Sequence, residues 1–180
     1  MIVVLSDTHG RESHRLEGRS REAVSEAALV CHCGDFVTEA VLDAFEAVVA
    51  DAGGRFVAVS GNNDQSAVRD RVSETEIVDH AGVRLALAHG HEHTDTSLAM
   101  FGRQSNADLV CVGHSHAPAF ERLGTVPVCN PGSHADPRRY RPAHAELTVA
   151  EDTLDGALVT PDGERFETFT VDLSPEEGED

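Results

Sequence analysis

Short apolar runs alternate with amphipathic stretches along the first two thirds of the chain. Runs typical of buried β-strands lie at residues 2–5, 29–31, 56–59, 85–88 and 109–112. Apolar positions recur at helical spacing over residues 20–28, and again from a Thr38 N-cap to the Gly53-Gly54 pair. The strand–helix–strand–helix–strand order over residues 1–60 predicts parallel pairing with right-handed crossovers.

The second half of the chain has a different pattern. Gly82 lies between two apolar runs and predicts a hairpin, and a helix is expected over residues 97–104. Beyond Ala117, short strand candidates are separated by Gly, Pro and Asp turns, which favours antiparallel pairing; they lie at 119–122, 126–129, 145–150, 157–160 and 166–171. We expect a single domain over residues 1–173 and a disordered acidic tail at 174–180.

Metal-ligand side chains follow five of the predicted strands. They are Asp7, His9, Asp35, Asn62, His89, His114 and His116. Any one of them alone would more often be a cap or a surface group. The carboxyl ends of strands in an open α/β sheet line the ligand crevice, so these side chains can converge. Mixed oxygen and nitrogen donors suit first-row divalent metals, and seven ligands fit two ions that share a carboxylate better than one tetrahedral ion.

These blocks resemble the signature of the calcineurin-like metallophosphoesterases, D-x-H … G-D … G-N-x-[DE] … H-G … G-H-x-H. The turn Asn130-Pro131-Gly132-Ser133 makes the sequence more similar to the small single-domain prokaryotic phosphodiesterases of that superfamily. The resemblance covers residues 1–150. It implies an α/β fold, a four-layer α-β-β-α sandwich with two mixed sheets flanked by helices. It also implies hydrolysis of a small phosphoester, a phosphodiester in particular, by attack of a metal-bridging hydroxide at a dinuclear site.

The resemblance further implies which residues hold each ion. Asp7, His9, Asp35 and His116 would bind the first ion, and Asp35, Asn62, His89 and His114 the second, with Asp35 bridging. Two divalent ions per chain are therefore expected. Manganese is favoured, while Ni, Fe, Zn and Co stay open because all of them accept N/O sites.

One position departs from the pattern of many larger relatives. Asn63 stands where those proteins have a histidine that protonates the leaving group, and an amide cannot act as a general acid at neutral pH. Asn62 and His91 are thus our candidate catalytic residues, while Asp64 should brace the loop. His93 is expected to be exposed, and the histidines outside the motif are expected to be structural or solvent-facing.

Phosphate binding needs cationic or hydrogen-bonding groups. Arg11, Asn63 and Arg138, with Arg139 and the Asn130–Ser133 turn, are candidates, since a guanidinium pairs bidentately with phosphate. A solvated surface charge is an equally good interpretation of each arginine.

The charge balance is strongly acidic. The 180 residues carry a formal net charge of −18, and all 14 basic residues are Arg. Proteins of halophiles often have an acidic excess spread along the chain, so we interpret the charge as salt adaptation. The alternative is an acidic face that binds a basic partner. Without a basic stripe, stable binding to duplex nucleic acid is not expected. The four cysteines lie in apolar surroundings and indicate buried thiols. Cys31-His32-Cys33 could be a metal clip, but its residues alternate along a strand and no second Cys/His pair has zinc-finger spacing, so we interpret it as structural.

No apolar run reaches the ~18 residues of a membrane span, and the first strand begins at Met1 or Ile2 without room for a signal peptide. A cytoplasmic protein is expected, and homo-oligomerisation stays open. Two alternative functions stand beside the phosphodiesterase. One is a phosphomonoesterase or protein phosphatase, and the other is a non-catalytic scaffold of the same fold, as in the small retromer subunit.

Overall fold

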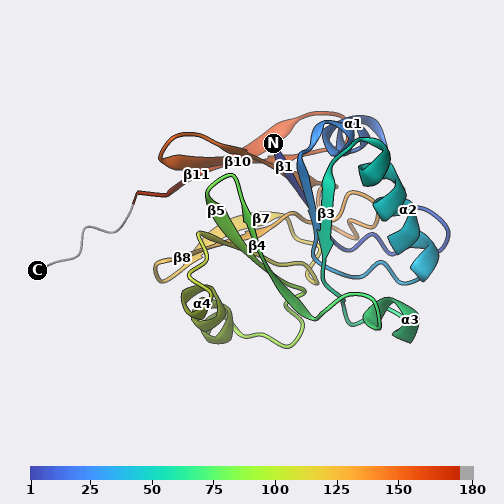
Figure 1. Cartoon of the computed structure of the whole chain (residues 1–180), viewed down its shortest axis with the longest axis horizontal. Helices are drawn as coiled ribbons and strands as arrows, with labels where there is room; N and C mark the ends of the chain where they lie inside the picture. Colours follow the sequence, from blue (N-terminus) through green and yellow to red (C-terminus); the bar gives the residue numbers. More distant parts are fainter. Residues whose placement is uncertain (175–180) are drawn as a thin grey trace, which may run out of the picture.

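Two mixed β-sheets form the centre of the molecule, as seen in a computed structural model that describes residues 1–174 (Figure 1). The first sheet has the strand order β11-β10-β9-β1-β2-β3. Its members are β1 (Ile2–Leu5), β2 (Leu29–His32), β3 (Arg55–Ala58), β9 (His144–Val149), β10 (Thr153–Val159) and β11 (Arg165–Asp172). β1, β2 and β3 pair in parallel, whereas β9, β10 and β11 add antiparallel strands.

The second sheet has the order β4-β5-β6-β8-β7. Its members are β4 (Thr75–His80), β5 (Val83–Ala88), β6 (Leu109–Cys111), β7 (Ala119–Leu123) and β8 (Val126–Asn130). The hairpin predicted at Gly82 is confirmed, since β4 and β5 pair antiparallel across a turn in which Ala81 and Gly82 have positive φ angles.

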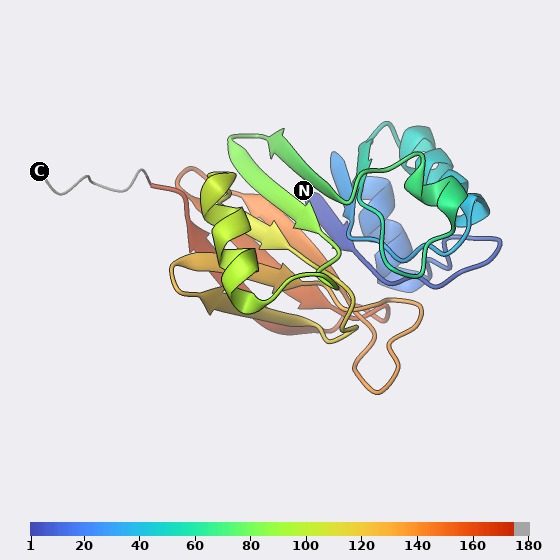
Figure 2. The same cartoon turned by 90° about the horizontal axis from the view of Figure 1, so that it is seen from below.

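Helices cover the outer faces of the sheets. α1 (Gly18–Glu26) and α2 (Glu39–Asp51) pack on the first sheet, and α4 (Asp95–Gln104) packs on the second; a short helix, α3 (Ser66–Arg69), follows β3. Figure 2 shows α4 on one side of the molecule and α1, α2 and α3 on the other. This arrangement confirms the α-β-β-α sandwich.

The main core lies between the two sheets. Apolar side chains from strands of both halves of the sequence meet there, among them Val4, Leu29, Leu87, Leu109 and Leu158. β1 and β2 contribute to this core with one face and to the α1–α2 layer with the other, so residues 2–5 and 29–31 are apolar at every position, and His32 is the polar residue at the end of β2.

Several boundaries differ from those predicted. Thr38 does occupy the N-cap position of α2, but its hydroxyl donates to the Arg11 carbonyl at 2.8 Å instead of capping the helix. α4 begins two residues earlier than expected, because Thr94 and Ser97 form a capping box. The four-residue α3 was not predicted, since one helical turn leaves no periodic pattern. The predicted disordered tail lies outside the described residues, apart from Ser174. Within residues 1–174, no helix combines the length and the apolarity needed to cross a membrane.

Candidate metal centre

All five predicted ligand blocks come together at the carboxyl ends of β1, β2, β3, β5 and β6. Backbone hydrogen bonds tie their loops to one another. The amides of Asp7 and His9 donate to the carbonyls of Gly34 and Asp35, each at 3.0 Å, and the Gly113 amide donates to the His89 carbonyl at 3.0 Å. The loops after β1 and β2, and likewise those after β5 and β6, are thereby joined in pairs.

Five of the seven predicted ligands have left-handed backbone conformations. Their φ angles lie between 45° and 66°, and they are Asp7, His9, Asp35, His114 and His116. Such conformations are costly for residues other than glycine and are found mostly where surrounding structure enforces them, often at functional sites. The sharp turns aim the side chains inward from the strand ends.

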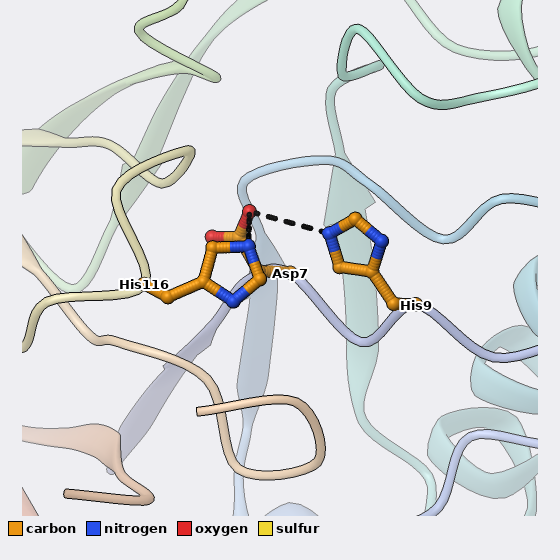
Figure 3. A group of neighbouring side chains, drawn as sticks. All are labelled: Asp7, His9 and His116. Carbon is orange, nitrogen blue, oxygen red and sulfur yellow. Dashed lines mark ion pairs between the residues drawn. The ribbon is translucent and has the colours of Figure 1, made fainter. Parts of the chain in front are cut away.

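Asp7, His9 and His116 form one half of the cluster (Figure 3). Oδ1 of Asp7 lies 3.4 Å from Nε2 of His116 and 3.9 Å from Nε2 of His9. The two imidazole rings stack with their centroids 4.9 Å apart.

Asp35 connects this half to the other. Its Oδ2 lies 3.2 Å from Nε2 of His9 and 3.3 Å from Nε2 of His89. The side-chain oxygen of Asn62 then lies 3.1 Å from Nε2 of His89 and 3.0 Å from Nδ1 of His114. All seven predicted ligands therefore belong to one contiguous group, with Asp35 in its middle.

The donor atoms fit a cation. Among residues 1–174, both carboxylate oxygens of Asp7 and Nε2 of His116 are buried without a hydrogen-bond partner. A buried polar group without a partner is costly, and a carboxylate facing imidazole nitrogens loses that cost when a metal ion lies between them. Oxygen and nitrogen donors without thiolates are the ligand set of first-row divalent ions.

Backbone carbonyls orient two of the imidazoles. Nδ1 of His89 lies 2.7 Å from the Cys33 carbonyl oxygen, and Nδ1 of His116 lies 2.5 Å from that of Asp136. A carbonyl oxygen only accepts, so in both rings Nδ1 carries a hydrogen, and Nε2 is the atom that points toward the carboxylates. This is how metal-ligating histidines are usually held.

The carboxylates and imidazoles shift each other's pKa values. Burial alone would raise the pKa of Asp35, but the contacts with His89, His9 and Asn63 outweigh it and hold the pKa far below its usual range. The contact with Asp35 raises the pKa of His9. Burial lowers the pKa of His89, but Asp35 outweighs this effect and the pKa is raised. Burial raises the pKa of Asp7. Without an ion, His9 and His89 therefore bind protons more tightly than free imidazoles do.

Asp64 braces the loops, as predicted. Its carboxylate is buried and accepts backbone amides from three places, Gly61 at 2.7 Å, Asp35 at 3.1 Å and Val37 at 2.6 Å. One side chain thereby joins the Asn62 loop to the Asp35 loop.

The Asn130–Ser133 turn has a bracing role where we had considered phosphate binding. The Asn130 amide donates to the Gly113 carbonyl at 2.8 Å and to the Ser115 hydroxyl at 3.0 Å, and its oxygen accepts from the Gly132 amide. The buried Ser133 hydroxyl donates to the Asp7 carbonyl at 2.7 Å. These polar atoms are committed to the ligand loops.

The cluster is partly open to solvent. Asp7, Asp35, His89 and His116 are buried, whereas Asn62, His114 and the neighbouring Asn63 are exposed. The Asn63 side chain donates to Oδ2 of Asp35 at 2.7 Å. The exposed edge is therefore the side from which a substrate can approach.

His91 lies at this open edge, and its ring centroid is 5.4 Å from that of His89 and 6.1 Å from that of His114. The expectation that His93 is exposed was wrong. It is half-buried with its ring 6.1 Å from Phe101, because the Phe101 side chain on α4 covers it.

Two arginines that we did not predict as site residues donate hydrogen bonds to the ligand loops. Arg69 donates to the Asn62 carbonyl at 2.8 Å, and Arg15 donates to the Thr8 carbonyl at 3.3 Å. Within residues 1–174, the Arg11 and Arg138 side chains form no hydrogen bond or ion pair with a predicted ligand, and both residues are exposed. Arg69 could not be found from sequence, because only the fold of α3 returns it to the Asn62 loop.

The two-sheet sandwich places carboxylate and imidazole groups together at its strand ends, which is the arrangement of a metal-binding α/β protein. The family model of the calcineurin-like phosphoesterase superfamily domain matches residues 1–152, and the chain belongs to that superfamily. A probable metallophosphoesterase of Bacillus subtilis is 32% identical over 157 residues, which is 84% of this chain and 85% of the relative. A phosphodiesterase of Methanocaldococcus jannaschii is 28% identical over 142 residues, 73% of this chain and 82% of the relative.

Solved structures show the same fold. A predicted phosphoesterase from Streptococcus pneumoniae aligns with a TM-score of 0.72 and 22% identity, covering 94% of this chain and 96% of that protein. Zinc-complexed Vps29 from Entamoeba histolytica aligns with a TM-score of 0.71 and 20% identity, covering 96% and 99%. At such identities these likenesses describe the fold alone.

Proposed function

We propose that the protein is a divalent-metal-dependent phosphodiesterase with a dinuclear centre. Asp7, His9, Asp35 and His116 would hold one ion, and Asp35, Asn62, His89 and His114 the other. The observation that carries this proposal is the position of Asp35. Its Oδ2 lies 3.2 Å from Nε2 of His9, a predicted ligand of the first ion, and 3.3 Å from Nε2 of His89, a predicted ligand of the second. Two bound divalent ions would supply water activation and neutralisation of charge on the phosphoryl oxygens.

The residues of the chain would divide the remaining work. The buried ligands exclude solvent from behind the centre, while the exposed Asn62 and His114 leave the front open to a substrate. Asn63 and Arg69 lie on that open side and offer hydrogen-bond donors to phosphate oxygens. A small phosphodiester is the favoured substrate class, because Asn63 cannot protonate a poor leaving group and the M. jannaschii relative is a phosphodiesterase.

The first test is metal content combined with turnover. Protein loaded with Mn²⁺ in molar KCl should contain two ions per chain by elemental analysis and should hydrolyse bis(p-nitrophenyl) phosphate faster than p-nitrophenyl phosphate. One ion or none per chain would contradict the dinuclear centre. A faster monoester reaction would favour a phosphomonoesterase, and metal binding without turnover of either ester would favour a scaffold of this fold.

His91 is proposed as the proton donor to the leaving group, because it is exposed and its ring lies next to those of His89 and His114. His91→Ala should then slow hydrolysis of an alkyl diester by ~10²-fold or more, since a positioned acid typically contributes 10²–10⁴-fold. A nitrophenyl diester needs no proton and should be much less affected. Steady-state rates over a series of leaving-group pKa values measure this difference, with His80→Ala on β4 as the control. Equal losses on both esters would show that His91 acts on binding or stability instead.

A further inference from the structure

His32 is the last residue of β2 and lies behind the ligand loops. Its side chain is fully buried, and both ring nitrogens have polar partners. Nε2 lies 2.9 Å from the hydroxyl of Thr8, and Nδ1 lies 3.2 Å from the backbone amide nitrogen of Gly34.

These partners define one tautomer. The Gly34 amide can only donate, so Nδ1 of His32 must be the acceptor and carries no hydrogen. A neutral ring then has its hydrogen on Nε2, from which it donates to the Thr8 hydroxyl. The ring is stacked on Phe36 with centroids 3.9 Å apart and lies 4.9 Å from Phe45, so aromatic packing fixes its plane.

The two partners belong to different ligand blocks. Thr8 lies between Asp7 and His9, while Gly34 immediately precedes Asp35. The imidazole therefore joins the loop after β1 to the loop after β2 from the buried side. Asp7, His9 and Asp35 all have left-handed backbones, which need such support because they are unfavourable by themselves.

We propose that His32 is a positioning residue for the metal centre: its neutral imidazole sets the spacing between the Asp7–Thr8–His9 loop and the Gly34–Asp35 loop, and thereby the metal affinity of the site. This inference rests on the proposed function, since it concerns the affinity of that same site. His32 touches neither substrate nor ion; it acts through Thr8 and Gly34.

The first measurement concerns the tautomer in the metal-free, full-length protein. Long-range ¹H–¹⁵N NMR correlations of the imidazoles should show His32 with a protonated Nε2 and a bare Nδ1, and the Nε2 hydrogen should exchange slowly with solvent. A protonated Nδ1, or an Nε2 hydrogen in fast exchange, would overturn the proposal because the Gly34 or Thr8 bond would be missing.

The second measurement is Mn²⁺ affinity by calorimetry. Thr8→Val replaces the hydroxyl with a methyl group of the same shape and should weaken Mn²⁺ binding 10–100-fold, the usual loss when a partner behind a metal ligand is removed. Thr8→Ser keeps the hydroxyl and should bind within about threefold of wild type on the same scale. His32→Leu should weaken binding at least as much as Thr8→Val.

His144→Leu is the control for loss of a buried histidine, because His144 is fully buried on β9 and bonds to Glu146 away from the ligand loops. It should lower the melting temperature without changing Mn²⁺ affinity. Wild-type affinity in Thr8→Val would overturn the positioning role while leaving the metal centre intact. A wild-type protein that binds no Mn²⁺ would instead contradict the proposed function itself.

Discussion

Each carboxylate oxygen of Asp35 has its own partners in the predicted metal centre. Its Oδ2 faces the imidazoles of His9 and His89, while its Oδ1 accepts the Asn63 amide at 2.8 Å. Both oxygens are thus committed, and the carboxylate is ionised because these contacts outweigh the effect of burial on its pKa. A residue in this position cannot be replaced by one with a neutral oxygen without changing the charge of the whole cluster.

Asp35→Asn is expected to remove most of the Mn²⁺ binding and to lower phosphodiester turnover by about 100-fold or more, beyond the 10–100-fold typical for loss of a partner behind a ligand. The amide lacks the charge needed to hold two cations. Elemental analysis and turnover of a nitrophenyl diester measure both effects. Asp51→Asn makes the same chemical change at an exposed position of α2 and should bind and turn over like wild type. Two ions retained in Asp35→Asn would place the bridge elsewhere.

Metal binding should strengthen as pH rises. The pKa values of His9 and His89 are raised above their ordinary value of 6.5, and both rings must lose a proton to bind a cation. Calorimetry between pH 6 and 8, in buffers of different ionisation enthalpy, should show proton release and an apparent affinity that falls at the acidic end.

In the metal-free protein, His9 and His89 should contribute more to folding stability at acidic pH than at neutral pH, whereas the buried His32 and His134, whose pKa values burial lowers, contribute in the opposite direction. A raised histidine pKa stabilises the folded state below pH 6.5 and loses this contribution as pH rises through the folded-state value. The raised pKa of Asp7 acts in the same direction. Metal affinity that is independent of pH would contradict this protonated description of the empty cluster.

The junctions between strands and loops position the predicted ligands. Where two of these loops touch, one of them has a glycine at the point of contact. At Gly61, a Cβ atom would lie 2.2 Å from Oδ1 of Asp35 and 2.5 Å from its backbone nitrogen. At Gly113, it would lie 2.8 Å from Oδ2 of Asp7. The glycines therefore allow the loops after β3 and β6 to approach the carboxylates of the loops after β1 and β2.

Gly61→Ala should push the Asp35 loop away and reduce Mn²⁺ affinity at least ~10-fold, the lower end of the loss for disturbed ligand support. Gly124→Ala is the matched control, because Gly124 has a φ of +66° with open space around it. It should cost about 1 kcal/mol of backbone strain and lower the melting temperature by roughly 2–4 °C without affecting metal affinity. Calorimetry and thermal melts of both variants separate the two effects. Unchanged Mn²⁺ affinity in Gly61→Ala would show that the loops can separate without disturbing the site.

The negative net charge affects the stability of the whole molecule. Acidic residues outnumber basic ones by 32 to 14, so single arginines serve several carboxylates. Arg71, for example, lies 3.4 Å from Glu39, 2.6 Å from Asp43 and 2.7 Å from Glu46. Such clusters remain negative after pairing, and the net charge of −18 must be screened by dissolved cations.

The melting temperature should therefore rise between dilute and molar KCl. The screening length falls from ~10 Å at 0.1 M to ~3 Å at 1 M, which removes repulsion between neighbouring acidic side chains. Differential scanning calorimetry of metal-free protein avoids effects of metal binding. A flat or falling curve would contradict salt adaptation and favour an acidic surface that binds a basic partner.

The sequence by itself was enough to predict the strands and the convergence of the candidate ligands. Buried runs such as residues 2–5 and 109–112 are continuous and apolar because both faces of those strands pack, and this pattern is local. The ligand side chains follow the strands directly, so the topology of an α/β sheet was enough to predict that Asp7, Asp35 and His116 meet.

Only the tertiary structure decided which residues support the predicted ligands through hydrogen bonds. Arg69, Asn130 and His32 acquire their roles from partners on other elements, at Asn62, Gly113 and Thr8. The tertiary structure also decided that Arg11 and Arg138 are exposed. A hydrogen bond between loops depends on distances of a few tenths of an ångström set by packing of the two sheets, and no local pattern of residues encodes such a distance.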